Sequence, residues 1–484
     1  MKKSLVLLAA LTAGCSTDPP QFLPPPFGPS GPSPIRLFFP TGLAKTSEGH
    51  LLVANGNFNH AFDGGTVVGI SRSYLDSVFL LRSAANAKLD CGLATTDPGF
   101  DARCSQQIPQ EQFTGAAMIG NYAGPLVLDG TGAAAYTGSR DSGTLNGVRI
   151  DPGVRVDAAG TLHCLPGAGD DATKDCRKGV IDLQPFGVDG PYGMVAGDTV
   201  FPGETTPHPA LFVASLIPHI EDISSGVIST SSSVAVLNLQ DPSQVFFRLQ
   251  VAQAFDISNG TAPGPIVFDR VRREIYLSGC YQRAASFGAG EPGTGLCVGS
   301  SNNFLRMMNV DSGTAASTVW VDLRSDVLST FTTQLLLADP DPVTGAPGTL
   351  WATMRNPDAL VRIGLPSEPS VAPRVRQAIP LPIAPADMAL IDRGSASALI
   401  AVASQNSNSL AVVDTASGDV VAQVGRLGDS PFNVAQISCP ASADYADSAC
   451  LAVSVFGACR VALIEVSKTQ PAATAVRALL GSCP

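Results

Sequence analysis

The stretch that decides the fold reads Leu410-Ala411-Val412-Val413-Asp414-Thr415-Ala416-Ser417-Gly418-Asp419-Val420-Val421-Ala422-Gln423-Val424-Gly425, and Asp429-Ser430-Pro431 follows it. Two short runs rich in β-branched and small apolar residues flank a turn that contains Asp, Thr and Gly, which is the pattern of a β-hairpin. The same order of apolar run, turn, second run, polar loop and third run recurs seven times along the chain. This recurrence predicts a repeat protein built from small antiparallel sheets.

The stretch resembles the YVTN class of β-propeller repeat, in which a strand, a D-T-x-x-G turn, a second strand and a G-x-x-P step lead into the next blade. The resemblance implies an all-β fold, and the best count is seven four-stranded blades. Seven blades take about 64 residues each, more than the roughly 40 to 45 of a minimal blade, so several loops must be enlarged. Six or eight blades stay open as alternatives, because residues 71–120 and 151–190 are weakly patterned. The innermost strands are expected at 42–47, 124–129, 192–195, 264–269, 334–338, 387–391 and 433–437.

The N-terminus has the layout of a bacterial secretory signal, with two lysines before an apolar stretch that ends at Gly14-Cys15. Small residues before a cysteine resemble a lipoprotein box, although Thr12 stands where that family usually has Leu, Val or Ile. The resemblance implies a signal peptide at 1–14, lipidation of Cys15 and, from Ser16 and Thr17, an outer-membrane location in a bacterial cell envelope. An ordinary cleaved signal is the alternative.

The next segment predicts a spacer. Residues 16–34 contain eight prolines, which prevent helix and sheet ladders, so 15–34 is expected to be an extended tether and 35–484 the propeller. No later segment has about 18 uninterrupted apolar residues. The expected membrane contact is therefore the lipid anchor. A formal net charge of −11 argues against nucleic acid as a partner, because nucleic-acid binding needs clustered positive charge.

The cysteines count as one plus ten. With Cys15 assigned to the lipid, the rest fall into close neighbours separated by loop-like sequence, which is typical of disulfides in an oxidising compartment. C-x-x-C spacing is missing, so neither zinc nor covalent haem is predicted. The expected pairs are Cys91 with Cys104, Cys164 with Cys176, Cys280 with Cys297, Cys439 with Cys450, and Cys459 with Cys483.

Polar residues gather in the predicted connections between second and third strands. In propellers these connections lie on one face, so the residues are expected around one mouth of the central channel, where they could bind a polar ligand or a cation. The candidate ligand face comprises Asn55, Asn57, Asn59, His60, Asp63, Arg140, Asp141, His219, Glu221, Asp222, Tyr281, Arg283, Arg355, Asn356, Asp358, Gln405, Asn406 and Asn408. The opposite face, whose connections are closed by disulfides, is expected to reinforce the fold.

Three motifs admit more than one interpretation. His60 and His219 stand close to carboxylates and could hold a divalent cation, although loops are also polar simply because they face water. Asp339-Pro340-Asp341 resembles a cation loop but suits a turn better. The G-x-G-x-x-G at 288–293 opens no helix, so it does not predict a nucleotide site. No cofactor is expected.

No catalytic motif was found, so repeats, tether and anchor favour a binding or scaffold module for a protein, a glycan or another polar ligand. A lactonase-like propeller enzyme with its active site at the channel mouth is the alternative. It would need carboxylates, an arginine and a histidine to converge there. A role in an extracellular electron or metal system is a third possibility, and it lacks a haem or copper motif.

Overall fold

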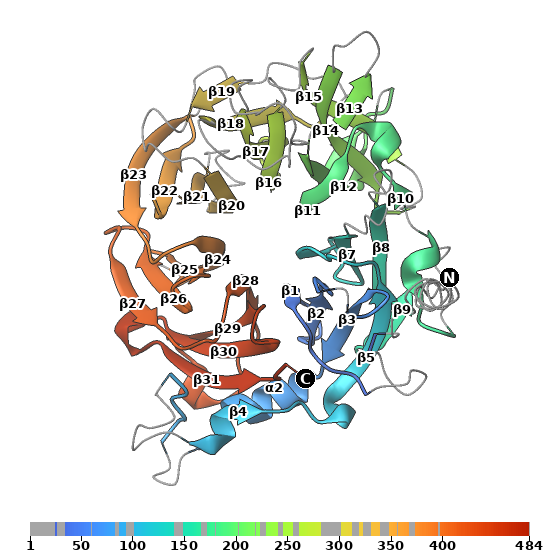
Figure 1. Cartoon of the computed structure of the whole chain (residues 1–484). Helices are drawn as coiled ribbons and strands as arrows, with labels where there is room; N and C mark the ends of the chain where they lie inside the picture. The colour runs from blue at the N-terminus through green and yellow to red at the C-terminus, as the bar shows by residue number, and fades with distance from the viewer. Residues whose placement is uncertain are drawn as a thin grey trace, which may run out of the picture.

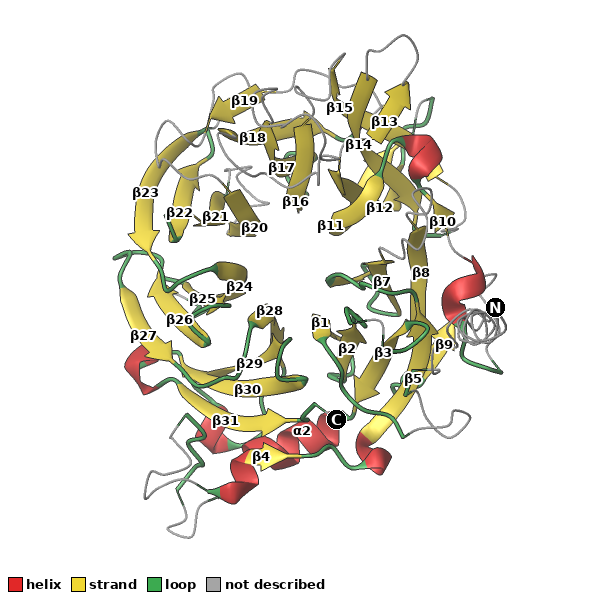
Figure 2. Ribbon diagram, viewed as in Figure 1, coloured by secondary structure: helices red, strands yellow, loops and turns green. Residues whose placement is uncertain are grey.

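The computed structural model describes residues 25–26, 34–59, 61–82, 87–92, 101–139, 149–165, 172–179, 181–201, 203–217, 219–222, 229–240, 245–254, 261–281, 302–311, 319–322, 331–338, 348–355, 357–366, 373–394 and 397–483. They form seven sheets of four or five strands, arranged as blades around a closed ring (Figure 1). Strands dominate and helices are short and peripheral (Figure 2). The predicted all-β, seven-bladed propeller is confirmed.

The connections within the first three blades contain extra short strands. Blade one contains β1 (Pro40–Lys45), β2 (Leu51–Asn55), β3 (Gly65–Ile70) and β5 (Phe113–Ile119). Blade two contains β6 (Leu126–Leu128), β7 (Ala134–Ser139), β8 (Arg149–Val156) and β10 (Ile181–Asp182), and β9 (Leu162–Cys164) also pairs with β8. Blade three contains β11 (Asp189–Val200), β12 (Pro207–Ile217), β13 (His219–Asp222), β14 (Ser229–Asn238) and β15 (Val245–Ala254).

The last four blades are simple antiparallel meanders. Blade four contains β16 (Thr261–Asp269), β17 (Glu274–Tyr281), β18 (Asn302–Asn309) and β19 (Val319–Asp322). Blade five contains β20 (Phe331–Ala338), β21 (Thr349–Arg355), β22 (Ala359–Gly364) and β23 (Arg374–Pro380). Blade six contains β24 (Pro385–Ile391), β25 (Leu399–Ser404), β26 (Ser409–Asp414) and β27 (Val420–Val424). Blade seven contains β28 (Pro431–Ile437), β29 (Ser448–Val455), β30 (Arg460–Ser467) and β31 (Ala475–Leu480).

The core is divided among the interfaces between blades. Each of the seven buried hydrophobic clusters joins two neighbouring blades, and one of them joins blade seven to blade one, which closes the ring. Middle strands are covered on both faces, so every residue of Leu399–Ser404 is buried. This explains why the sequence shows continuous apolar runs rather than alternation.

Most of the innermost strands begin with an irregular step in their pairing. Six of the seven carry a register shift near their first residues. In blades one, six and seven the residue before the opening proline is left-handed, with φ of 47° at Phe39, 61° at Ala384 and 59° at Ser430. Such a conformation is uncommon outside glycine and reverses the chain sharply. These steps carry the chain from the outer edge of one blade to the centre of the next.

Blade seven has a fifth strand that comes from blade one. The connection between β3 and β5 contains α2 (Arg72–Phe79), the 3₁₀ turns Ala102–Cys104 and Gln110–Gln112, and β4 (Ser105–Gln106). This segment, residues 71–112, is called the clasp below. It lies along β31 in Figure 1, where β4 pairs in parallel with β31. The clasp thus covers the outer edge of blade seven, which would otherwise present unpaired backbone groups.

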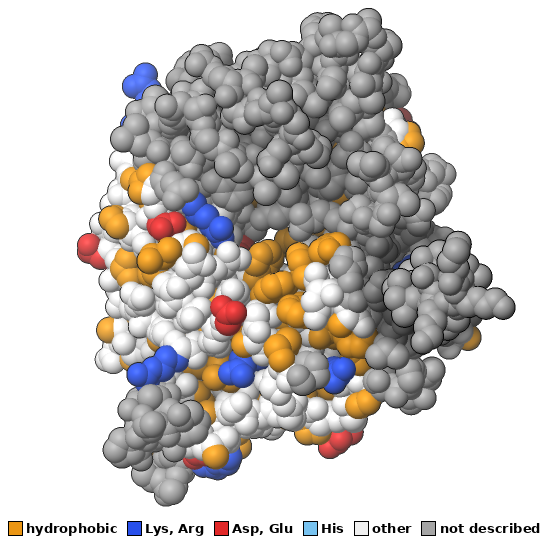
Figure 3. All heavy atoms as spheres, in the orientation of Figure 1, with side chains coloured by type: hydrophobic (Ala, Val, Ile, Leu, Met, Phe, Trp, Pro, Cys, Tyr) orange, Lys and Arg blue, Asp and Glu red, His pale blue; other side chains and the backbone are white. Residues whose placement is uncertain are grey.

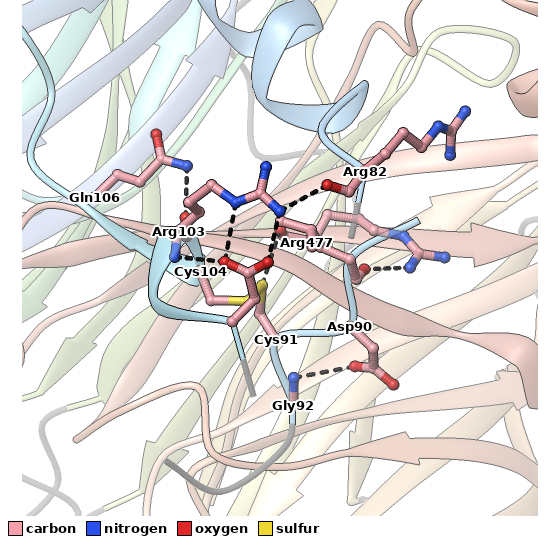
Figure 4. The surroundings of a disulfide bond; sticks show 10 residues. Arg82, Asp90, Cys91, Gly92, Arg103, Cys104, Gln106 and Arg477 are labelled. Carbon is pink, nitrogen blue, oxygen red and sulfur yellow. Dashed lines mark hydrogen bonds and ion pairs between the residues drawn. A yellow bond between two sulfur atoms is a disulfide. The ribbon is translucent and has the colours of Figure 1, made fainter. Parts of the chain in front are cut away.

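The Cys91–Cys104 disulfide ties the two halves of the clasp together. Figure 4 shows this bond beside Arg103 and Arg477. The Cys91 amide donates to the Val476 carbonyl at 2.7 Å, and the Gly481 amide donates to the Gln106 carbonyl at 2.7 Å. The cross-link therefore supports the backbone contacts that join blade one to blade seven.

Four of the five predicted disulfides lie within the described residues and are confirmed. They are Cys91–Cys104, Cys164–Cys176, Cys439–Cys450 and Cys459–Cys483. Cys297, the expected partner of Cys280, lies outside the described residues. One expectation needs correction, because Cys459 lies in the connection between β29 and β30, on the same face as the predicted ligand loops. Disulfides therefore do not mark the opposite face alone.

The other helical elements within the described residues are 3₁₀ turns at Cys176–Gly179, Gln184–Phe186, Ala443–Tyr445 and Pro471–Ala473. In the part of the chain that the structure describes, no helix has the length and apolar character needed to cross a bilayer. The predicted signal peptide, Cys15 and most of the tether lie outside the described residues. Those assignments stay predictions.

Candidate functional site: the central cavity

A cavity of about 740 Å³ lies on the axis of the ring, and the innermost strands of all seven blades line it. Figure 3 shows hydrophobic side chains gathered around the middle of one face of the molecule. We call the face formed by connections between second and third strands and between blades the loop face. Volumes of 300–1,000 Å³ are usual for small-molecule sites, so this cavity has the size of a ligand pocket.

Among the described residues of the lining, the side formed by blades one to four is apolar, whereas blades five to seven contribute both polar and apolar side chains. Blades one to four contribute apolar side chains and one glycine, including Leu126 from blade two, Met194 from blade three and Ile266 from blade four. Every polar side chain in the described part of the lining comes from blades five to seven. These side chains are Thr333, Gln334, Arg355, Asp387, Gln405, Ser430 and Asn433.

Arg355 brings a positive charge to the loop-face end of the cavity. It is the last residue of β21 and is half-buried. Its Nη2 donates to Gln405 Oε1 at 2.7 Å, and its Nε donates to the Pro385 carbonyl at 3.2 Å. Both partners belong to blade six, so the guanidinium bridges two blades. These bonds hold it in one orientation, and an arginine side chain stays charged at all physiological pH values.

Asp387 is the centre of a hydrogen-bond network on the cavity wall. Its side chain is 6% exposed. One carboxylate oxygen accepts from Gln334 Nε2 at 2.8 Å, and the other accepts from Asn433 Nδ2 at 2.5 Å and the Val434 amide at 2.8 Å. Burial raises the pKa of Asp387, and these hydrogen bonds oppose the rise.

The same hydrogen-bond network also links blade seven to blade one. Asn433 Oδ1 accepts from the Leu43 amide at 2.8 Å. Asp387 and Asn433 thus have equivalent structural roles, because the side chain of each accepts a hydrogen bond from a backbone N–H in the innermost strand of the following blade. Their buried polar atoms are satisfied within the protein, which gives both residues a structural role in the wall.

Aromatic side chains border the cavity where blades one and seven meet. Phe58 packs edge-on against Phe456 with ring centroids 4.9 Å apart, and it also contacts Tyr122 at 5.0 Å. Phe39 and Phe432 lie 5.2 and 6.4 Å from Phe456. Phe58, Phe432 and Phe456 line the cavity. This aromatic group makes the loop-face end apolar on one side, opposite in character to the Arg355 side.

Several predicted ligand residues prove to be structural. Asn55 and Asn57 are fully buried. Asn55 Nδ2 donates to Thr66 Oγ1 at 2.8 Å, while Asn57 binds Asn121 and the backbone of Phe62. They were expected to face a ligand. Their side-chain amides instead form hydrogen bonds that stabilise the bend of the chain after β2.

Asp63 and Asn408 are also held by protein contacts. Arg177, from the enlarged connection of blade two, donates to the Asp63 carbonyl at 2.9 Å and lies 3.6 Å from its carboxylate. Asn408 has φ of 51° and accepts through its carbonyl from the Leu427 amide at 3.2 Å. Asn59 and Asn406 are exposed, and the backbone carbonyl of Asp358 accepts from the Leu381 amide. Of the described candidates, Arg355 and Gln405 line the cavity.

The other candidates are described in part or not at all. His219, Glu221 and Asp222 belong to strand β13, which pairs with β14, where a loop was expected. Tyr281 ends β17. The side chains of these four residues are not among those described. The residues that lie entirely outside the described part of the chain are His60, Arg140, Asp141, Arg283 and Asn356. The turn at 339–341 and the glycine motif at 288–293 also lie outside it.

Sequence reasoning overlooked Gln334, Asp387 and Asn433, although a signal for them existed. Each is the first residue of a predicted innermost strand, and an innermost strand must place some side chains on the channel. The apolar lining residues on the innermost strands were also overlooked, although the same signal applied to them. Among the described residues, no group of three or more His, Cys, Asp or Glu side chains is placed to hold a metal ion.

Comparisons with known proteins support the fold. No protein-family model and no curated protein matches the sequence. The structure is similar to Kuenenia stuttgartiensis Hydrazine Synthase, with a TM-score of 0.50 and 11% identity over 90% of this chain and 97% of that chain. It is also similar to the Myceliophteria thermophila Cps50 (Swd1) β-propeller domain, with a TM-score of 0.47 and 11% identity over 89% and 98% of the two chains. At 11% identity the first likeness concerns the fold alone, so the YVTN-type and lipoprotein resemblances stay predictions, and the chain is placed by its architecture as a seven-bladed β-propeller.

Proposed function

We propose that this chain is a binding module of the bacterial cell envelope, anchored by a lipid on Cys15, that takes its ligand in the central cavity. The observation that carries the proposal is the cavity itself, which combines an apolar side, an aromatic border and one fixed arginine. Four disulfides indicate a compartment outside the cytoplasm, because cytoplasmic thiols are kept reduced. A protein or glycan partner at the loop face is a further candidate.

The enzyme alternative has less support in the described residues. A lactonase-like site needs carboxylates, an arginine and a histidine that converge on the substrate. The described lining holds Arg355 and Asp387 but no histidine, and both oxygens of Asp387 already accept hydrogen bonds. A binding role therefore fits the cavity better than catalysis.

A neutral apolar fluorophore tests whether the cavity binds ligands. We expect N-phenyl-1-naphthylamine to bind the full-length protein saturably and with increased fluorescence. The double substitution Val127→Trp with Val267→Trp enlarges two lining residues from blades two and four. Displacing about 50 Å² of buried probe surface should weaken binding roughly tenfold.

The matched control is Val420→Trp, because Val420 lies on an outer strand and is 40% exposed. This variant should bind the fluorophore as the wild type does. If the cavity variant binds equally well, or if the wild type does not bind, the central cavity is not the ligand site.

A further inference from the structure

The charged side chains in the described lining of the cavity are engaged by the protein itself. Both oxygens of Asp387 accept hydrogen bonds, and Gln334, which supplies one of them, also accepts from the Leu335 amide at 3.0 Å. Arg355 donates to two oxygens of blade six and has a further interaction within the protein. A charged ligand group would therefore lose its hydration without meeting an unengaged opposite charge among the described lining residues, and such a loss is costly.

An uncharged ligand avoids this cost and gains from the rest of the lining. The side formed by blades one to four is apolar among the described residues, and Met388 and Val434 add apolar side chains from blades six and seven. Removing apolar ligand surface from water against these side chains is favourable. The lining thus favours an uncharged ligand.

The aromatic group at the loop-face end of the cavity indicates what kind of uncharged ligand fits. Phe58 packs edge-on against Tyr122 and Phe456, and Phe39 and Phe432 also lie beside Phe456. All five side chains are half-buried, and three of the rings line the cavity. Rings that served the fold alone would be covered by it, whereas these retain exposed surface beside a cavity of ligand size.

The backbone adopts unfavourable conformations to hold these rings in place. Phe39 and Tyr122 are left-handed, with φ of 47° and 53°, which bulky residues rarely adopt. A Cβ atom at Gly56 would clash with the Phe58 ring, so this ring needs bare backbone beneath it. The Gly56 amide donates to the Phe39 carbonyl at 3.0 Å, and its carbonyl accepts from the Tyr122 amide at 2.6 Å. Strain that is fixed by such contacts is typical of binding sites.

An aromatic ligand gains more from this group than a saturated one of the same shape. Edge-to-face and offset ring pairs are worth about fivefold in affinity beyond the burial of their surface. Met194 and Met388 add thioether groups to the lining, and sulfur also contacts aromatic rings favourably. A saturated ring would gain from burial alone.

We propose that the cavity binds an uncharged aromatic molecule, whose ring contacts Phe58, Phe432 and Phe456 and whose remainder lies against the apolar lining. This inference rests on the proposed function and names the ligand class of the same site. It accounts for the aromatic border and for the internal hydrogen bonds of the polar wall together.

Displacement of N-phenyl-1-naphthylamine by four compounds of similar size separates charge from aromatic character. At neutral pH, 2-naphthalenemethanol is uncharged, 2-naphthoate is an anion and 2-naphthalenemethylamine is a cation. We expect the alcohol to displace the fluorophore at a concentration about tenfold lower than either ion requires, because only the ions lose the hydration of a charge. Decahydro-2-naphthalenemethanol, the saturated alcohol, should be about fivefold weaker than its aromatic counterpart.

Substitution of one ring assigns the aromatic preference to its position. Phe456→Leu should weaken 2-naphthalenemethanol about fivefold. It should leave the saturated alcohol within about twofold, which also reports that the cavity is intact. Phe247→Leu is the matched control, because Phe247 is a half-buried phenylalanine on β15, an outer strand of blade three.

The outcomes distinguish this inference from the proposed function. If either ion displaces the fluorophore as well as the aromatic alcohol does, or if the saturated alcohol does so, the cavity is a ligand site of another preference and the inference fails alone. The same holds if Phe456→Leu and Phe247→Leu lose equal affinity for 2-naphthalenemethanol. If neither the fluorophore nor any of the four compounds binds, both proposals fail.

Discussion

At the scale of the single residue, Asp387 makes stability depend on pH. Burial raises the pKa of Asp387 in the folded chain, whereas in the unfolded chain the group titrates near its ordinary value of about 3.9. Between these two values the folded state binds the proton and the unfolded state does not, so acid favours folding. We expect the wild type to gain stability relative to Asp387→Asn as the pH falls from neutral through the raised pKa. Urea unfolding of both proteins at a series of pH values measures this difference.

The matched control for Asp387 is Asp419→Asn, at an exposed position of the same blade. Its difference from the wild type should stay nearly constant over the same pH range. If the stability difference between the wild type and Asp387→Asn does not change with pH, or changes in the opposite direction, the pKa of Asp387 is not raised in the folded state. The comparison of variants is needed because many other groups titrate together in the pH dependence of one protein.

At the scale of the element, the clasp determines how blade seven is finished. The Cys91–Cys104 bond closes a loop with a sequence separation of 13. Replacing both cysteines by serine should cost about 3 kcal/mol in the free energy of unfolding, the value for a loop of this length. We also expect faster hydrogen exchange at the backbone amides of positions 91 and 481. In the wild type these amides donate hydrogen bonds between the clasp and the β31 region.

The Cys439–Cys450 bond provides the comparison, because it closes an inner hairpin of the same blade with a separation of 11. Its removal should cost a similar amount of stability and leave exchange at Gly481 unchanged. Equal acceleration at Gly481 in both double variants would mean that blade seven opens as a unit, and that the clasp bond does not act locally.

At the scale of the whole molecule, attachment and binding should be separable. We expect Cys15→Ala to move the protein from the detergent phase to the aqueous phase in Triton X-114 partitioning, because the acyl anchor is lost. Fluorophore binding should not change, since the cavity lies entirely in the propeller. Unchanged partitioning of Cys15→Ala would refute lipidation, and lost binding would refute the separation of tether and propeller.

Strand positions and disulfides could be predicted from the sequence because their causes are local. The run Leu399–Ser404 is apolar throughout since both of its faces are covered, and turn residues mark its ends. Cys439 and Cys450 lie close in sequence across one hairpin, so their pairing needs no knowledge of distant contacts. Repetition of such local patterns, together with the resemblance to the YVTN class of repeat, predicted a propeller with seven blades as the best count.

The tertiary structure alone decided which polar residues reach the cavity. Asn57 and Arg355 occupy equivalent connections in the sequence, yet Asn57 is buried against Asn121 while Arg355 lines the cavity. The clasp is a similar case, because residues 71–112 connect β3 and β5 of blade one, yet β4 within this segment pairs with β31 of blade seven. Burial and pairing of this kind depend on contacts between residues that are tens or hundreds of positions apart. A local pattern carries the preference of a segment for strand or turn, but not the identity of the distant surface that completes it.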